Sequence, residues 1–171
     1  MKKIAHLKSF KTKNLDNNKI KQICKLKMQH YNFSLDKQKK WFKEIIKKDF
    51  IHNMFYIDKK LIGYNCLRTF YIKDKLKFLL FDTIVIDKKF RKLGYSEKII
   101  KKINQLIKKN KVFGLLLCKK SMKNYYQNFG WKVLKKNKII KLKEKKICMT
   151  YKYKNNFKYL LSHAKSHIEI I

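Results

Sequence analysis

Apolar residues recur along the chain with two periods, and the period separates helices from strands. Helical spacing covers three long segments, residues 17–31, 37–46 and 96–109. Asp16 and Asp36 stand at the start of the first two segments and are expected to cap them. A short fourth helix is predicted at residues 122–129. The clearest helix is the third, whose apolar stripe is Ile99, Ile100, Ile103, Leu106 and Ile107.

Strand-like segments fill most of the remaining chain. The most apolar run is 79–86, which contains one acid, Asp82, and is typical of a central strand buried on both faces. The order is strand, two helices, three antiparallel strands, helix, strand, helix and further strands. This order predicts an α+β fold with one mixed, mostly antiparallel sheet flanked by helices. The other predicted strands are 4–10, 54–57, 61–71, 112–118 and two or three strands within 131–153.

The domain organisation follows from length and linkers. A chain of 171 residues is the size of one domain, and no stretch rich in proline, glycine or serine divides it. Residues 1–154 are expected to form this single domain, and residues 155–171 a basic, partly helical C-terminal tail.

The high positive charge of the chain does not by itself identify a functional class. The chain has 46 basic and 11 acidic residues, a formal charge of +35, which first suggests a nucleic-acid binder. However, only Arg68 and Arg91 are arginines, so 44 of the 46 are lysines, whereas specific phosphate and base recognition relies on the guanidinium group. The absence of proline and the two alanines point to an A/T-biased coding sequence. Against this background, the four glycines are informative: Gly63, Gly94, Gly114 and Gly130.

Targeting segments, disulfides and metal sites are not expected. No run approaches 18 apolar residues, and the N-terminal apolar run is too short for a signal-peptide core. His163 and His167 have the i, i+4 spacing of metal ligands but lack a third ligand nearby, so no metal is predicted. The cysteines form no Cys-x-x-Cys pair and are expected to be reduced, as in a cytoplasmic protein: Cys24, Cys66, Cys118 and Cys148.

The segment 84–100 carries the strongest chemical signal. A buried strand runs into a short basic loop and then into a helix whose first turn holds Gly94 and Ser96. A helix start presents unpaired N–H groups and the positive end of the dipole, which favour an anion. Gly94 lacks the Cβ that would keep a phosphate from the backbone, and Arg91, Lys92 and Lys98 add charge. An ordinary capped helix after an ordinary loop is the other interpretation.

Two motifs make the signal specific. Arg91-x-x-Gly94-x-Ser96 resembles the Arg/Gln-x-x-Gly-x-Gly/Ala loop of the GNAT superfamily, the GCN5-related N-acetyltransferases. About thirty residues later, after a predicted strand, Tyr125-Tyr126-Gln127-Asn128-Phe129-Gly130-Trp131 resembles that family's Phe-Tyr-Glu-Lys-x-Gly-Phe signature. The match is clear over residues 76–134, and the predicted element order extends it to most of the chain.

The resemblance implies an enzyme that transfers an acetyl or other acyl group from acyl-CoA to a primary amine. The amine attacks the thioester directly, with no covalent enzyme intermediate. The backbone of Ile84, Val85 and Ile86 would bond the pantetheine arm. The amides of the loop would bind the pyrophosphate, and the loop consists of Arg91, Lys92, Leu93, Gly94, Tyr95 and Ser96.

Two residues are candidates for proton transfer. Tyr126 falls on the family's acid position, with a packed core aromatic as the alternative. Asp82 is the candidate base, because burial in an apolar strand raises a carboxyl pKa and because it shares a face with Ile84 and Ile86. The family's strand-borne glutamate corresponds to Leu80 instead, and a structural hydrogen bond is the alternative role for Asp82.

The sequence departs from the family pattern at three positions. Ser96 replaces the second small residue of the loop but keeps an amide. Lys119 stands where the family often has Asn, and Trp131 stands where Phe is commoner. Cys118 ends a strand near the expected thioester, but without a base placed beside it the expected role is packing.

The acceptor and the donor remain open. The family builds its acceptor site mainly from the first two helices, here about residues 14–52, and from a late hairpin, here within residues 131–153. These segments carry Tyr31, Asp36, Trp41, Glu44 and Asp49, and an amine on a small molecule, an amino sugar or a peptide fits. One alternative is an acyltransferase whose donor is an acidic acyl carrier protein, steered by the lysines. Another is a non-enzymatic module associated with nucleic acid. Lysines spread around whole helices disfavour this last alternative, and no specific nucleic-acid partner is expected.

Overall fold

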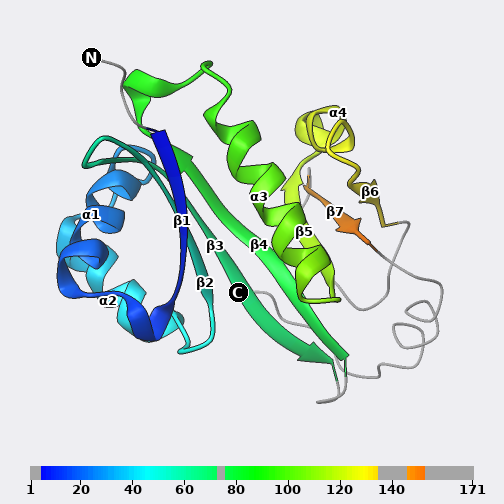
Figure 1. The fold of residues 1–171 in the computed structure, drawn as a ribbon, viewed down its shortest axis with the longest axis horizontal. Helices are drawn as coiled ribbons and strands as arrows, with labels where there is room; N and C mark the ends of the chain where they lie inside the picture. The colour runs from blue at the N-terminus through cyan, green and yellow to red at the C-terminus, as the bar shows by residue number, and fades with distance from the viewer. Residues whose placement is uncertain (1–4, 73–75, 135–145, 153–171) are drawn as a thin grey trace. The chain divides into compact units, whose positions relative to one another are not determined.

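Figure 1 shows the computed structural model of the chain, which describes residues 5–72, 76–134 and 146–152. The predicted C-terminal tail and the pair His163 and His167 lie outside the described residues, as does the middle of the late hairpin. No helix in the described segments is long and apolar enough to cross a membrane.

The described residues form an α+β fold whose sheet is mixed and mostly antiparallel, as the sequence predicts. Its seven strands have the order β1-β2-β3-β4-β5-β7-β6. Strands β4 and β5 pair in parallel, and β1–β2, β2–β3, β5–β7 and β6–β7 pair antiparallel. The strands are β1 (Ala5–Lys11), β2 (Ile51–Ile57), β3 (Lys60–Ile72), β4 (Leu76–Ile86), β5 (Phe113–Lys119), β6 (Lys132–Val133) and β7 (Lys146–Tyr151). The helices are α1 (Asn17–Met28), α2 (Leu35–Ile45), α3 (Tyr95–Lys109) and α4 (Lys123–Gln127), with short 3-10 turns η1 (Thr12–Asn14), η2 (Lys88–Phe90) and η3 (Lys120–Met122).

The capping predictions have different outcomes for the first two helices. Asp16 caps α1 as predicted, because its side chain accepts a hydrogen bond from the amide of Lys19 (2.8 Å). The prediction that Asp36 caps α2 is wrong. Ser34 caps this helix by accepting from the amide of Lys37 (3.3 Å), so the helix begins earlier than the acid. Asp36 lies in the first turn, where its negative charge favours the helix dipole.

Strand β2 begins at Ile51, three residues earlier than the predicted start at Met54. The sequence pattern did not predict this because His52 and Asn53 are polar, although both are completely buried. Each is satisfied by a hydrogen bond across the strand pair. The His52 ring lies 2.8 Å from the hydroxyl of Tyr64, and Asn53 donates to the side-chain oxygen of Asn65 (2.9 Å).

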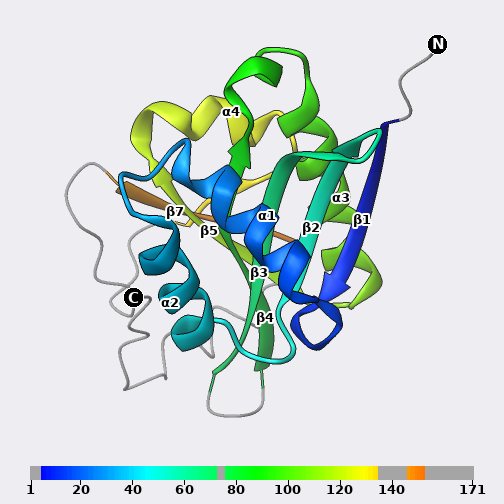
Figure 2. The same ribbon diagram turned by 90° about the vertical axis from the view of Figure 1, so that its left-hand side faces the viewer.

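The contacts of the chain gather in two compact units, each of which is described by itself. Unit 1 comprises Met1–Thr69 and Asp82–Ile103. Its helices α1 and α2 cover one face of its strands (Figure 2), and Ile23, Phe42 and Met54 belong to the core between them. The first turns of α3 cover the other face, where the ring of Tyr95 packs on Phe55 at 5.2 Å between centroids.

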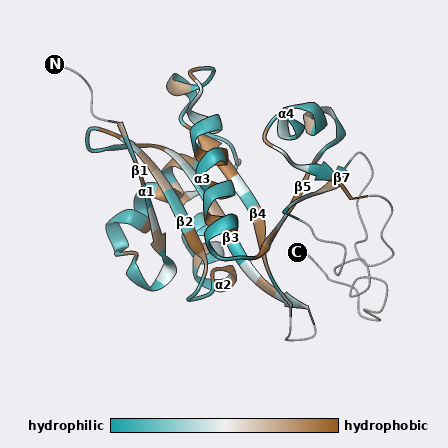
Figure 3. Ribbon diagram, turned by 45° about the vertical axis from the view of Figure 1, so that its right-hand side comes forward, coloured by the Kyte–Doolittle hydropathy of each residue, from teal (hydrophilic) through white to brown (hydrophobic). Residues whose placement is uncertain are grey.

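Unit 2 comprises Phe70–Phe81 and Asn104–Ile171. The apolar strand β5 is mostly brown in Figure 3. Near its start, a Cβ on Gly114 would lie 2.9 Å from the ring of Trp131 and 2.6 Å from Ile107, so glycine allows this close packing. Trp131 is 1% exposed, and its indole N–H donates to the side-chain oxygen of Asn104 (3.1 Å).

Candidate functional site

The loop that joins β4 to α3 is anchored in unit 1 by one buried carboxylate. Asp87, 4% exposed, accepts from the amide of Lys89 (3.0 Å) and pairs with the ammonium of Lys60 (3.1 Å). Its own amide donates to the carbonyl of Ile62 (2.8 Å). Burial raises the pKa of Asp87, but the hydrogen bonds from Lys89, Lys60 and Gln29 outweigh burial, and the pKa lies below its ordinary value. The carboxylate is therefore charged and holds the start of the loop.

The backbone of the loop is left-handed at two residues, Lys92 (φ 61°) and Gly94 (φ 74°). A Cβ built on Gly94 would meet no atom within 4 Å, so the space beside this residue is open on the protein side. The amide of Lys98 donates to the carbonyl of Gly94 (3.3 Å), which makes this the first bond of α3. The loop therefore ends at the N-terminus of α3, the positive end of the helix dipole.

One side chain of the loop packs against unit 1, and most of the others are exposed and positively charged. Tyr95 packs inward on Phe55, and its ring is therefore not available to a ligand. Lys88, Lys89, Arg91, Lys92 and Lys98 are exposed, and Leu93 is 59% exposed. The predicted loop residues thus lie together as a short, exposed, cationic segment.

The predicted strand residues before the loop offer only their backbone. Val85 is 1% exposed and belongs to the core under α1 and α2, and Ile86 is 7% exposed with its side chain against Gly63. Ile84 is half-buried. Side-chain contacts from this stretch to a ligand are therefore excluded for Val85 and Ile86, whereas backbone contacts of the kind that the resemblance implies remain open.

Asp82 lies in β4 beside Arg68 of β3. The carboxylate Oδ2 and the guanidinium Nη1 are 3.9 Å apart, and the side chains are 27% and 11% exposed. Burial raises the pKa of Asp82 above its ordinary value, while the positive charges of Arg68 and Lys27 act against the rise. The direction is the one expected from the sequence, and the ion pair with Arg68 is a structural role that the sequence did not suggest.

Lys27 supplies a second cation to this group. It is 5% exposed, and its ammonium lies 3.4 Å from the ring centroid of Trp41 and 5.7 Å from that of Tyr31. Burial lowers the pKa of Lys27, and the nearby charge of Asp82 raises it in part. We name Asp82, Arg68, Lys27, Tyr31 and Trp41 the Asp82 group.

Sequence reasoning missed Lys27 and Arg68, although each left a signal. Lys27 follows Ile20, Ile23 and Cys24 at helical spacing on the apolar face of α1, a position where a lysine is unusual. The abundance of lysine elsewhere hid this. Arg68 is one of the two arginines, and the same rarity argument that singled out Arg91 applies to it. Of the other acceptor candidates, Asp36 and Glu44 form exposed pairs with Lys39 and Lys40.

Tyr126 lies in unit 2, on α4. It is 5% exposed, and its ring packs edge-on against Phe81 at 5.8 Å between centroids. Burial raises the pKa of Tyr126, and the neighbouring Cys118 and Tyr125 raise it further. The phenol therefore stays protonated at neutral pH and is suited to donate a proton rather than to accept one.

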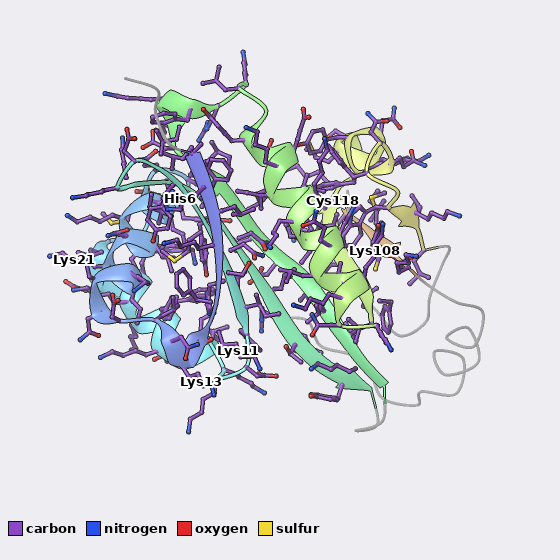
Figure 4. The ribbon with its side chains drawn as sticks, viewed as in Figure 1. His6, Lys11, Lys13, Lys21, Lys108 and Cys118 are labelled. Atoms are coloured by element: carbon purple, nitrogen blue, oxygen red, sulfur yellow. The ribbon has the colours of Figure 1, made fainter. Side chains whose placement is uncertain are left out.

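Cys118, labelled in Figure 4, ends the apolar part of β5. Its Sγ lies 3.8 Å from the sulfur of Met149, and burial raises the pKa of the thiol. A protonated thiol is a poor nucleophile, so the contacts favour packing, the role expected from the sequence. Within the described segments, no three or more His, Cys, Asp or Glu side chains gather as metal ligands would.

Comparison with known sequences finds no protein-family model and no curated protein that matches the chain. Solved structures do match. An acyl-CoA N-acyltransferase from Pseudomonas aeruginosa is 14% identical, with a TM-score of 0.67 over 86% of this chain and 99% of that chain. The ribosomal-protein-S18-alanine N-acetyltransferase from Escherichia coli is 11% identical, with a TM-score of 0.64 over 86% and 92%. An aminoglycoside 6'-N-acetyltransferase complexed with coenzyme A is 10% identical, with a TM-score of 0.66 over 84% and 95%. At such identities these likenesses define the fold.

Proposed function

We propose that this chain, which has the fold of the GNAT acetyltransferases, is an N-acyltransferase that moves an acetyl or other acyl group from acyl-CoA to a primary amine. The observation that carries the proposal is the loop from Arg91 to Ser96. It leads into the positive end of α3, its Gly94 is left-handed, and the space where a Cβ would project is open. This cradle fits a pyrophosphate, which binds through backbone amides and needs a close approach.

Each group has one task in the proposed reaction. The loop amides hold the pyrophosphate, and the backbone of Ile84 to Ile86 bonds the pantetheine arm. Asp82 accepts the proton that the acceptor ammonium must lose, which leaves a lone pair on the nitrogen. This nitrogen bonds to the carbonyl carbon, the carbon–sulfur bond breaks, and Tyr126 gives its proton to the departing thiolate. The new amide nitrogen loses its extra proton, which restores the phenol of Tyr126. The phenol of Tyr126 is protonated at neutral pH, so its proton is present for this step, and its raised pKa makes it a weaker acid than an ordinary tyrosine.

The acceptor is proposed to be a primary amine on a small molecule or a peptide. Two of the similar structures are named for such acceptors, an alanine of ribosomal protein S18 and an aminoglycoside. In this chain Tyr31 and Trp41 belong to the Asp82 group and are the aromatic side chains proposed to line the acceptor site.

The described cysteines are free thiols, which supports a reducing compartment such as the cytoplasm.

A second candidate donor is an acidic acyl carrier protein, favoured by the exposed lysines around the loop. A nucleic-acid module is disfavoured because lysines are spread over the surface. Figure 4 labels Lys11, Lys13 and Lys21 around β1 and α1 and Lys108 on α3, all exposed and on separate elements. Tight binding of DNA that survives 200 mM salt, measured by fluorescence titration, would favour the module, because contacts driven only by charge weaken steeply with salt.

Calorimetry with acetyl-CoA at low salt tests the proposal. We expect saturable binding by the wild type and a loss of affinity of at least about 100-fold in Gly94→Asn. Asn adopts left-handed backbone readily, so this variant should fold and should lose binding through its side chain. Gly94→Ala should lie between the two. Failure of the wild type to bind any CoA thioester would overturn the enzyme proposal, and wild-type affinity in Gly94→Asn would overturn the role of the loop.

A panel of amines assayed for release of free CoA then identifies the acceptor. The same assay with an acylated carrier protein in place of acyl-CoA separates the two donor hypotheses. Turnover only with the carrier protein would replace the proposed donor.

A further inference from the structure

The turn that follows α1 is tied to the proposed pyrophosphate loop by two adjacent side chains of unit 1. The side-chain oxygen of Gln29 accepts from the amide of Lys88 (3.0 Å), and its nitrogen lies 3.4 Å from the carboxylate of Asp87. The ring of His30 contacts the carbonyl of Ile86 and the guanidinium of Arg91. The turn after α1, a helix on the proposed acceptor side, therefore supports the loop on the proposed donor side.

The hydrogen bonds of His30 define its protonation. Nε2 lies 2.8 Å from the carbonyl oxygen of Ile86, which only accepts, so Nε2 carries the hydrogen. Nη2 of Arg91 lies 3.1 Å from Nδ1 and 3.2 Å from Nε2, and these nearly equal distances place it over the face of the ring. Nε of Arg91 is 3.5 Å from the carbonyl of Ile86. The guanidinium is thus bound at the start of its own loop.

The charges around the ring favour this neutral form. Burial lowers the pKa of His30, and the nearby Arg91 and Lys88 lower it further, against the hydrogen bond to Ile86 and the charge of Asp87. A neutral His30 lets the guanidinium of Arg91 lie against the ring. A protonated His30 would have donors on both nitrogens and would repel the guanidinium.

We propose that His30 is a positioning residue for acyl-CoA, which acts by holding the guanidinium of Arg91 in place beside the loop before the pyrophosphate arrives. This inference rests on the proposed function of the loop. Arginine has many rotamers, and fixing it in advance removes an entropic cost from binding. Because the ring and the guanidinium act as a pair, their effects on affinity should not add.

The test is a double-mutant cycle with coenzyme A as the titrant. Calorimetry compares the wild type with His30→Ala, Arg91→Ala and the double variant, and His6→Ala of β1 is the matched control. We expect His30→Ala to weaken binding about fivefold to tenfold, and to weaken it less than about twofold when Arg91 is already alanine. The control should stay within about twofold of the wild type.

His30→Gln supplies a readout that a structural role would not move. Glutamine carries both a donor and an acceptor, so it can bond Ile86 and Arg91 and should restore most of the affinity. In steady state, His30→Ala should raise KM for acetyl-CoA and leave kcat unchanged. Thermal unfolding of each variant confirms that it is folded.

The outcomes separate this inference from the proposed function. A wild type that binds no coenzyme A overturns both. A wild type that binds, together with unchanged affinity in His30→Ala, additive losses in the cycle, or a His30→Gln variant as weak as His30→Ala, overturns the inference alone.

Discussion

Asp82 and Tyr126, the two groups proposed to move protons, lie in opposite electrostatic surroundings. Asp82 is on a strand beside two cations, and burial acts against the charges of Arg68 and Lys27 on its pKa. Tyr126 is on a short helix among aromatic rings and thiols, and burial, Cys118 and Tyr125 all raise its pKa. Opposing effects therefore act on the pKa of Asp82, whereas the effects on the pKa of Tyr126 act in one direction and keep the phenol protonated.

The difference is consistent with the two proposed roles. Environments that favour different protonation states for two groups can separate a base from an acid. The carboxyl of Asp82 keeps nearby cations that stabilise its charged form, so it can act as the base. Burial, Cys118 and Tyr125 all raise the pKa of Tyr126, so the phenol keeps its proton until a thiolate forms.

The largest effect is expected from Asp82→Asn. Loss of the base should lower kcat about 1000-fold at pH 7, with the Kd of acetyl-CoA within about twofold of the wild type. The wild-type rate should fall as the pH falls through the raised pKa of Asp82, because the base works only when deprotonated, and this acid limb should vanish in the variant. Steady-state rates from pH 5 to 9 test this.

Asp16→Asn is the matched control for that experiment, because asparagine caps a helix as well as aspartate does. Its rate should equal that of the wild type. A normal kcat in Asp82→Asn, combined with a lower melting temperature, would show that Asp82 serves only the ion pair with Arg68.

A smaller effect is expected from Tyr126→Phe. Loss of the acid should lower kcat about 100-fold, less than loss of the base, because a thiolate is a fair leaving group without a proton. Tyr125→Phe, the same change one residue earlier, should leave kcat within about twofold. Equal losses in the two variants would assign Tyr126 to packing against Phe81 and not to proton transfer.

The smallest effect is expected from Lys27→Met, which keeps the apolar stem and removes the charge. The positive charge of Lys27 lowers the pKa of Asp82, so its removal should raise that pKa and move the acid limb of the rate to higher pH. We expect a loss of about threefold at pH 6 and little change at pH 8.5. Lys25→Met, an exposed lysine of the same helix, should leave the profile unchanged. A limb that does not move in Lys27→Met would argue that another group titrates.

The elements that the sequence predicted well are those whose signal is local. The apolar stripe of α3, the cap at Asp16 and the loop around Gly94 each depend on residues close together in the chain. The start of β2 was missed because His52 and Asn53 are polar, and only partners on β3 make their burial acceptable. The cap of α2 was misplaced because Ser34 and Asp36 are both good caps, and the packing of the helix decides where it begins.

The order of elements, the loop proposed to bind a pyrophosphate and the two candidates for proton transfer could all be inferred from the amino-acid sequence. Helical and strand periods, and the glycine of the loop, act over a few residues and are visible in the sequence. The surroundings of these residues become visible only in the folded chain. Lys27 from α1 and Arg68 from β3 meet Asp82, and His30 meets Arg91 across 61 residues of chain. Such contacts depend on how the strands and helices pack, and no pattern within one segment encodes them.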